Sequence, residues 1–329
     1  MTFLYIIVAL TIIFDFINGF HDSANSIACI VSTKVLSPFA AVCMAAFFNF
    51  IAFVIFPLNV ATTMYKGIVV PEVINLNVIG AALIAAITWN LATWWLGLPS
   101  SSSHTLVGGL VGAAVVSSGW GAVISGGVIK IVAFILISPL LGFLFAHFFS
   151  SIIMWIFRRV PAFTVDKLFR RFQLFSASAF SLGHGANDAQ KSMGIIWVAL
   201  MISGLISKDA KVPPIWVVLS CQAAIALGTL FGGWRIVKTM GQRITKIKPF
   251  EGFCAEISGS VALFIATHWG IPVSTTHTIT GAIMGVGARK GASSVKWGVT
   301  RKIFIAWIIT IPVSASIGAI MYLFFNWVN

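Results

Sequence analysis

The chain has 329 residues, of which 59% are hydrophobic and only 9% are charged, and its formal net charge is +13. A soluble domain has about 25% charged residues, so this composition excludes a soluble globular protein and indicates one embedded in a lipid bilayer. The positive charge does not indicate a nucleic-acid partner, because the basic residues lie at the ends of apolar segments, where membrane topology places them.

Apolar segments long enough to cross a bilayer, which takes about 20 residues, follow one another along the chain. The ten predicted segments are Thr2–Thr33, Ser37–Leu58, Val73–Leu96, Pro99–Ser118, Ala122–Phe157, Phe172–Ser207, Pro213–Trp234, Gly252–Trp269, Pro272–Ala288 and Ile303–Val328. We expect the first and the sixth to be broken, near Asn18–Asn25 and Gly183–Lys191, because glycines and polar residues interrupt them there. The expected fold is an all-α, multi-pass integral membrane protein of the plasma membrane, the inner membrane in a bacterium.

The two halves of the chain repeat one another. The polar stretch Ser181–Gly194 has a copy 166 positions earlier, in Asn18–Ser26, and this offset is about half the chain length. Each half contains five apolar segments, and an odd number of crossings places the halves in opposite orientations. We therefore predict an N-terminal inverted repeat in residues 1–157, a cytoplasmic linker in 158–171 and a C-terminal inverted repeat in 172–329. Broken or re-entrant helices of the two repeats would meet at the bilayer midplane.

The basic residues predict how the chain is oriented. If the N-terminus is outside, the loops on the inside contain 16 of the 21 basic residues, at Lys34 and within 158–171, 235–248 and 289–302. Positively charged loops remain on the cytoplasmic side of a membrane. We therefore predict that both the N-terminus and the C-terminus lie outside.

Carboxylates and asparagines occur inside apolar segments of both halves. Asp22 and Asn25 lie in the first copy of the polar motif, and Asn187 and Asp188 lie in the second. Lipid cannot hydrate such groups, so they must face one another or a cavity lined by protein. A cluster rich in oxygen suits a hard cation such as Na⁺, or a proton carried by a carboxylate. Glu256, an acid in an apolar segment without a counterpart in the first half, suits the same role.

A second pair of motifs places hydroxyl groups after a Gly-x-Pro turn, in Gly97–Thr105 and, 173 positions later, in Gly270–Thr278. Pro99 and Pro272 suit the first turn of a helix, and the hydroxyls suit its N-cap. A helix that begins inside the membrane has free N–H groups with partial positive charge, and with the hydroxyls it can bind an anion without Lys or Arg. Inversion would point two such helix starts at each other, which suits a tetrahedral oxyanion. The hydroxyls concerned belong to Ser101, Ser102, Ser103, Thr105, Ser274, Thr275 and Thr276. The glycines that follow, and that allow close helix packing, are Gly108, Gly112, Gly281 and Gly285.

Histidines and one lysine accompany these motifs. His104 and His277 end the hydroxyl runs, whereas His21 and His184 stand in the aspartate motifs with Lys191. A membrane histidine is often a packing group, but repetition in both halves favours a role in shaping the site. We expect these five residues to orient the site without a catalytic role. The four cysteines lack metal-ligand spacing and identify no metal centre, and we expect no cofactor.

Together the four motifs resemble those of the PiT family of inorganic phosphate transporters, in the same order and over nearly the whole chain. The matching pieces are Gly19–Asn25, His184–Lys191, Leu98–Thr105 and Ile271–Thr278. The resemblance implies a symporter that imports inorganic phosphate with a cation, an inverted-repeat fold and a homodimer. It also implies that the hydroxyl runs bind phosphate. The coupling-cation positions that it implies are Asp22, Asn25, Asn187, Asp188 and Glu256.

One departure from the family concerns the coupling ion. The Na⁺-dependent animal members have a pattern like Gly-x-Asn-Asp-Val-x-Asn in both repeats, whereas this chain has His21 at the first asparagine and Lys191 at the last. A lysine ammonium at a cation position would repel Na⁺ or balance the charge of phosphate. The chain is more similar to the bacterial branch, which implies H⁺ rather than Na⁺ as the coupling ion, and a divalent metal–phosphate complex as a further form of cargo.

Three other functions fit parts of the sequence. A permease for another oxyanion, such as sulfate, would use the same hydroxyls. An intramembrane hydrolase would use Ser103 as nucleophile and His104 as base, but adjacent residues rarely reach the geometry this needs, and duplication of the run favours binding. A purely structural membrane protein would not repeat aspartates inside the bilayer. We therefore expect a transporter and not an enzyme.

Overall fold

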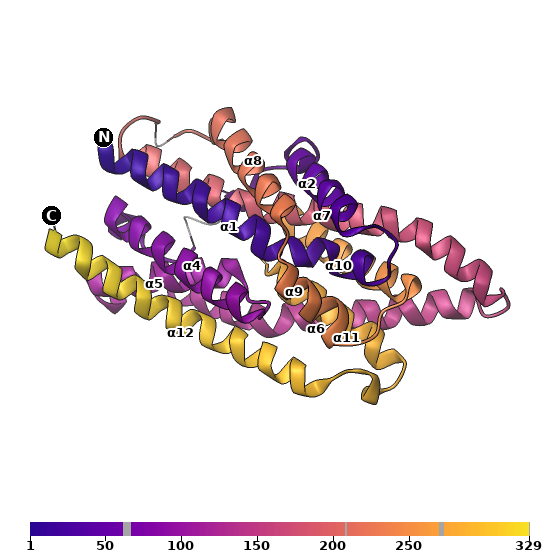
Figure 1. The fold of residues 1–329 in the computed structure, drawn as a ribbon. Coiled ribbons are helices and arrows are strands. Elements are labelled where there is room, and N and C mark those ends of the chain that lie inside the picture. Colours follow the sequence, from indigo (N-terminus) through magenta and orange to yellow (C-terminus); the bar gives the residue numbers. More distant parts are fainter. Residues whose placement is uncertain (62–66, 208, 270–272, 329) are drawn as a thin grey trace.

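The computed structural model describes residues 1–61, 67–207, 209–269 and 273–328, and the regular structure of this part of the chain is almost entirely helical. Long helices lie side by side in an elongated bundle, with the start of α1 and the end of α12 at one end and the turn between α6 and α7 at the other (Figure 1). The α-helices are α1 (Thr2–Ser32), α2 (Pro38–Ile55), α4 (Leu76–Leu96), α5 (Ser102–Ser118), α6 (Ser125–Ile156), α7 (Ala162–Ile202), α8 (Ile215–Phe231), α9 (Trp234–Lys238), α10 (Pro249–His268), α11 (Thr275–Arg289) and α12 (Trp297–Val328). Short 3₁₀ turns (Pro71–Val73, Trp120–Ala122 and Ala292–Ser294) and a π-helical turn (Thr239–Arg243) complete the described elements.

The composition of these helices confirms a multi-pass membrane protein. Within the described residues, α1, α2, α4, α6, α10 and α12 are long and apolar enough to cross a bilayer, and α8 with the segment Trp234–Arg243, bent by 60° at their junction, forms a broken span or a re-entrant loop. Large apolar side chains such as Leu136 and Phe148 remain exposed along α6, as expected of a surface that faces lipid.

Two of the ten predicted spans are short helices that begin in the interior of the protein. α5 has 17 residues and α11 has 15. At 1.5 Å per residue they are about 26 Å and about 22 Å long, against a hydrocarbon core of about 30 Å. Both begin among buried residues, because Ser102 and Thr275 are each 2% exposed. The prediction of helices that start inside the membrane is therefore supported by α5 and α11.

The predicted breaks in the aspartate-bearing helices are wrong, because α1 and α7 run without interruption through Asn18–Asn25 and Gly183–Lys191. The glycines of these motifs instead allow neighbouring helices to approach. A Cβ atom on Gly19 would collide with the backbone of Ile225 in α8, and one on Gly185 would collide with the backbone of Asn49 in α2. The glycines are thus needed for packing, and no broken helix bares carbonyl groups at these two places.

The glycines of α5 and α11 have the packing role that the sequence predicts. Cβ atoms on Gly108 and Gly112 would collide with the backbone of α12, and Cβ atoms on Gly281 and Gly285 would collide with the backbone of α6. The short helix of each half is therefore clasped by the last helix of the other half. This reciprocal packing agrees with two equivalent halves, while their inverted topology and the boundaries 1–157, 158–171 and 172–329 stay predictions. Much of 158–171 is helical, since α7 begins at Ala162.

Serine side chains cap the two short helices. The Oγ atom of Ser101 accepts a hydrogen bond from the N–H of His104 (3.4 Å), and that of Ser274 accepts one from the N–H of His277 (3.2 Å). The predicted use of hydroxyls as N-caps is confirmed for these two serines. Pro99 lies before the first turn of α5, contrary to expectation. Pro272 lies outside the described residues.

Close packing between the halves is testable at Gly112. Gly112→Ala would force α5 away from Ala315 of α12, and overpacking of this kind costs about 1–3 kcal/mol. We expect the purified variant to melt at a lower temperature than the unmodified protein in a fluorescence-based thermal assay. Gly121→Ala is the matched control, because no atom lies within 4 Å of its added Cβ. Equal melting temperatures for the two variants would contradict the packing role.

Candidate functional site

The carboxylate of Asp22 lies between the starts of α5 and α11. The hydroxyl of Ser102, the first residue of α5, donates to Asp22 Oδ2 (3.1 Å), and the hydroxyl of Thr276 in α11 donates to Asp22 Oδ1 (3.3 Å). His21 Nδ1 lies 2.7 Å from the same Oδ1 atom. One carboxylate of α1 therefore binds both short helices, which come from opposite halves of the chain.

Asp188 of α7 occupies the equivalent place in the second half. Its Oδ2 accepts a hydrogen bond from the hydroxyl of Thr275 (3.0 Å) and lies 3.1 Å from His184 Nε2. Its Oδ1 forms a buried ion pair with Lys191 Nζ. The ammonium of Lys191 also donates to the hydroxyl of Ser103 and to the carbonyl of Val273 (3.4 Å). Lys191 thus ties α7 to both α5 and the segment that precedes α11.

The two carboxylates are close enough to repel each other. Ligand atoms of Asp22, His184 and Asp188 all lie within 4.8 Å of one another. Two unit negative charges at that separation repel by about 3 kcal/mol at an effective dielectric constant of about 20. Lys191 compensates one of them directly, and Asp22 has only His21 and hydroxyl groups. The site therefore favours one further positive charge, a proton or a metal ion.

The motif asparagines have oxygens that remain free. Asn25 Nδ2 donates to the hydroxyls of Thr275 (3.3 Å) and Thr276 (2.9 Å), and Asn187 Nδ2 donates to the hydroxyl of Thr267 (3.4 Å). The Oδ1 atoms of both asparagines are buried and accept no hydrogen bond from a described residue. Carbonyl oxygens in this condition are suitable ligands for a hard cation. The geometry thus agrees with the predicted cation role of these two residues.

The predicted histidines fall into two groups. His21 bridges Asp22 and the hydroxyl of Thr93 (3.1 Å), whereas His184 lies between Asp188 and Asn49, with Nδ1 at 3.2 Å from Asn49 Oδ1. Each of these two histidines thus contacts one carboxylate and one further polar side chain.

His104 and His277 instead pack ring against ring, with centroids 4.8 Å apart, and His277 stacks on Trp307 at 3.9 Å. Their contact shows that the first turns of α5 and α11 lie next to each other. The site-shaping role that the sequence predicts for the four histidines stays a prediction.

Three of the seven predicted anion-binding hydroxyls contact the two carboxylates, and a fourth contacts Lys191. Ser102, Thr275 and Thr276 donate to the carboxylates, and Ser103 accepts from Lys191. Ser101 and Ser274 are the N-caps of α5 and α11. Thr105 differs from these residues, because its hydroxyl donates to Asn90 Oδ1 (3.2 Å) and to the backbone of Ser102 (2.6 Å). It holds α5 against α4 and does not point a hydroxyl at the site.

Glu256 does not belong to this cluster. Its carboxylate accepts hydrogen bonds from Ser176 (2.6 Å) and Gln173 (3.4 Å), and Gln173 in turn accepts one from Thr33 (2.9 Å). Ser176 precedes Asp188 by 12 residues on the continuous helix α7, which corresponds to about 18 Å. The structure therefore separates Glu256 from the other predicted cation positions and places it in a second buried polar cluster.

The whole site is closed to solvent in this conformation. Every predicted site residue is at most 6% exposed, including the charged side chains of Asp22, Asp188, Lys191 and Glu256. A ligand can enter or leave only if helices move. A buried site of charges and helix starts within a bundle of apolar helices is typical of a membrane transporter that alternates between closed and open states.

The sequence prediction missed the residues that surround the motifs. Thr93 links His21 with the hydroxyl of Ser100 (2.9 Å), and Thr267 binds Asn187. A signal for both was present, because each threonine stands three or four residues before a Gly-x-Pro turn, once in each half. Gln173 carried no such signal, since Glu256 and its partners have no counterpart in the first half.

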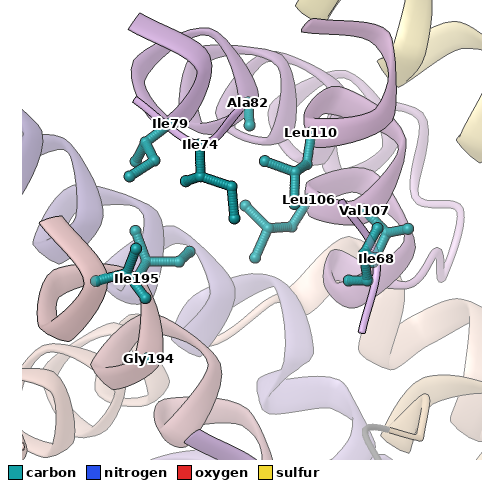
Figure 2. Close-up of a pocket in the computed structure, with 10 residues that line it drawn as sticks. Ile68, Ile74, Ile79, Ala82, Leu106, Val107, Leu110, Gly194 and Ile195 are labelled. Atoms are coloured by element: carbon teal, nitrogen blue, oxygen red, sulfur yellow. The ribbon is translucent and has the colours of Figure 1, made fainter. Parts of the chain in front are cut away.

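An apolar cavity of about 40 Å³ lies beside the site and is not part of it (Figure 2). It is lined by aliphatic side chains of α4, α5 and α7, among them Ile79, Leu106 and Ile195, together with Ile68 and Ile74. Leu106 follows the hydroxyl run of α5 directly. A cavity without polar groups offers nothing to bind an anion, so phosphate has no place there.

Comparisons with known proteins agree with this geometry. Residues 18–318 match the model of the Phosphate transporter family. A protein of Rhizobium meliloti (strain 1021) named "Probable low-affinity inorganic phosphate transporter" is 55% identical over 96% of this chain and 94% of its own. A protein of the same name from Bacillus subtilis (strain 168) is 45% identical over 99% and 97%. A solved structure described as "The sodium-dependent phosphate transporter" is similar with a TM-score of 0.91 and 26% identity, over 100% of both chains.

The family match covers most of the chain, and the two bacterial relatives align over nearly their whole length. The chain therefore belongs to the phosphate transporter family, which confirms the resemblance inferred from the four motifs. The relatives are named as transporters, in agreement with the expectation that the protein is not an enzyme.

The buried ion pair predicts a specific pattern of stability. Lys191→Met leaves Asp188 without its cation, and removal of one partner of a buried pair costs about 3–5 kcal/mol. We expect the purified variant to melt well below the unmodified protein, and the double variant Lys191→Met, Asp188→Asn to recover most of the loss, because both charges are then absent. A double variant as unstable as Lys191→Met alone would show that the pair does not determine the effect.

Proposed function

We propose that the protein is a secondary active transporter that imports inorganic phosphate in symport with a cation, and that the cation is H⁺ rather than Na⁺. The observation that supports this most strongly is the meeting of two helix starts and two carboxylates in one closed site. The same hydroxyls that bind Asp22 and Asp188 lie where an anion would be held. A single site thus has groups for both the anion and the cation.

Phosphate would be bound by the starts of α5 and α11. The hydroxyls of Ser101, Ser103 and Ser274 accept hydrogen bonds but donate none to a described residue, so their protons are available to phosphate oxygens. The first N–H groups of both helices add further donors and partial positive charge. Ser102, Thr275 and Thr276 can turn their hydroxyls from the carboxylates to phosphate. Lys191 supplies the one full positive charge at the start of α5.

The cation would be bound by the carboxylates and the free amide oxygens. Neutralisation of Asp22 or Asp188 by a cation lowers the repulsion that an entering phosphate meets. Phosphate in turn favours the cation, because coupling between two ligands is reciprocal. Asn25 and Asn187 offer buried oxygens to the same cation. Glu256, apart from this centre, would act as a separate cation position with Gln173 and Ser176.

The preference for H⁺ is supported by the position of Lys191. In the aligned repeats Lys191 corresponds to Asn25, and the contacts correspond as well. Asn25 binds Thr276 of the opposite half, and Lys191 binds Ser103 of the opposite half. The ammonium group therefore stands where the other half has a neutral amide. A fixed positive charge there repels Na⁺, whereas a proton can be taken up by a carboxylate.

The carboxylates also favour phosphate over sulfate as the transported anion. Near neutral pH inorganic phosphate retains a P–OH group that can donate a hydrogen bond to Asp22 or Asp188, and sulfate has no such proton. A sulfate ion would leave the carboxylate facing a second anion, and an unpaired buried charge is costly. A permease for another oxyanion remains the alternative function, and competition by sulfate distinguishes the two.

Further features of the proposal concern cargo and assembly. Asp22, His184 and Asp188 form a group that can hold a divalent metal, so a metal–phosphate complex is a suitable cargo. We also propose a homodimer in the bacterial inner membrane with both termini outside. These features are supported by the resemblance to the family and by the charges of the loops.

Uptake of labelled phosphate into proteoliposomes tests the proposed function. We expect an inward H⁺ gradient to drive accumulation and an inward Na⁺ gradient at constant pH to have little effect. Ser103→Ala should lower uptake about tenfold, since loss of a hydrogen bond costs about 1–1.5 kcal/mol. Ser258→Ala is the control, because that buried hydroxyl donates to its own helix at Cys254 (2.6 Å). Uptake indifferent to both gradients would contradict symport, and sulfate competing as well as phosphate would favour the alternative function.

The coupling ion can be tested at Lys191. Lys191→Asn recreates in the second half the amide found at Asn25, so we expect phosphate uptake by this variant to become stimulated by Na⁺. Lys191→Met is the matched control, because it removes the same charge but offers no oxygen to a cation. Stimulation by Na⁺ in both variants, or in neither, would contradict the assignment of Lys191 as the residue that excludes Na⁺.

A further inference from the structure

Asp15 is a buried acid that the proposed site does not use. It lies on α1, seven residues before Asp22, and is 0% exposed. Its Oδ1 accepts a hydrogen bond of 2.7 Å from the hydroxyl of Ser192 on α7. Its Oδ2 is also buried and accepts no hydrogen bond from any residue in the described part of the chain. The hydroxyl of Ser192 and the weakly donating thiol of Cys221 are thus the hydrogen-bonding neighbours of this carboxyl among the described residues.

Asp15 differs from the other intramembrane aspartates in its lack of a cationic neighbour in contact. Asp22 is paired with His21, and Asp188 with His184 and Lys191. Among the described residues Asp15 takes part in no ion pair. An isolated ionised carboxylate in a dry interior costs several kcal/mol, and an acid at such a place in a membrane protein has a function more often than a structural role. The simplest way to remove this charge is to bind a proton.

The surroundings of Asp15 are polar on the side of α8. Cys221 of α8 is a close neighbour, and Gln222 beside it is 0% exposed with neither amide atom hydrogen-bonded to a described residue. Asn18, one turn along α1, also has a buried Oδ1 without a donor. Asn18 and Gln222 thus bring buried polar atoms without partners among the described residues to the neighbouring helices α1 and α8, and a buried water binds to such atoms.

The charged groups that act on Asp15 belong to the central site. Asp188 and Lys191 of α7 are its charged neighbours, and Cys221 is its titratable neighbour on α8. α4 carries no titratable residue, and α2 carries only Cys43. A negative charge on Asp15 attracts Lys191 away from phosphate and repels the phosphate itself, whereas a proton on Asp15 removes both effects.

We propose that Asp15 is a third carboxyl that shares the coupling proton with Asp22 and Asp188, and that Asn18, Ser192 and Gln222 support it. The inference deepens the proposed H⁺–phosphate symport and depends on it. One O–H bond forms at Asp15 when a proton enters from one side of the membrane, and the same bond breaks when the proton leaves on the other side. The aligned position in the second half is Ser181, so only one half carries this group. The proton pathway is therefore asymmetric, although the phosphate site is built by both halves.

The test separates exchange of phosphate from its accumulation. Asp15→Asn has nearly the same shape but cannot carry a proton. We expect proteoliposomes containing this variant to exchange internal for external labelled phosphate at a rate near that of the unmodified protein. They should not accumulate phosphate in response to an inward H⁺ gradient. Asp15→Glu keeps a carboxyl and should accumulate phosphate with a shifted pH profile. Glu251→Gln is the control, because this carboxylate pairs with Lys290 outside the site. It should accumulate phosphate with the pH profile of the unmodified protein.

Each result of these transport assays either supports or overturns the role of Asp15. Accumulation by Asp15→Asn with the pH profile of the unmodified protein overturns the inference and leaves the proposed function intact. Failure of the unmodified protein to take up phosphate overturns the proposed function itself. If Asp15→Asn does not fold, Asp15→Glu decides, because a folded Asp15→Glu variant with an unchanged pH profile contradicts a role for Asp15 in carrying the proton.

Discussion

The structure depends on the contact between two carboxylates and two helix starts. Asp22 and Asp188 lie on different long helices and belong to different halves of the chain, yet hydroxyls of α11 bind both of them, and a hydroxyl of α5 binds Asp22. Without these hydroxyls the two negative charges would repel each other in a medium that cannot hydrate them. Without the carboxylates, the hydroxyls of Ser102, Thr275 and Thr276 would lose their acceptors in the same medium. Each set of groups therefore needs the other, and a closed site results.

Glycine determines where that contact can form. Gly19 and Gly185 bring α1 and α7 against the partner helices of the opposite half, and Gly112 and Gly285 do the same for α5 and α11. The polar groups are held in place by unbroken helices that touch backbone to backbone. Because Thr276 contacts Asp22 and Lys191 contacts Ser103 across the halves, movement of one half relative to the other would break these contacts. Such movement is what a buried site needs in order to open to either side of the membrane.

Much of the fold and of the candidate site was predictable from the sequence, because the sequence motifs that indicate them are local and occur twice. The apolar segments, the hydroxyl-bearing starts of α5 and α11 and the aspartates of α1 and α7 follow from residue type and spacing. The continuity of α1 and α7 was not predictable in this way. A glycine before a polar cluster permits either a break or a close approach, and only the neighbouring backbone decides between them. The position of Glu256 and the partners of Asp15 depend on which helices lie together, which sequence spacing within one helix does not show.

The account places phosphate and cation in one site, where each favours the other. The most direct measurement is the binding of phosphate to the purified protein at low and high pH, with and without Na⁺, compared with the double variant Asp22→Asn, Asp188→Asn. We expect phosphate to bind more tightly to the unmodified protein at low pH, after correction for the protonation of phosphate itself. We also expect this dependence to disappear in the double variant. Phosphate affinity that follows only the protonation of phosphate in the unmodified protein would contradict the account.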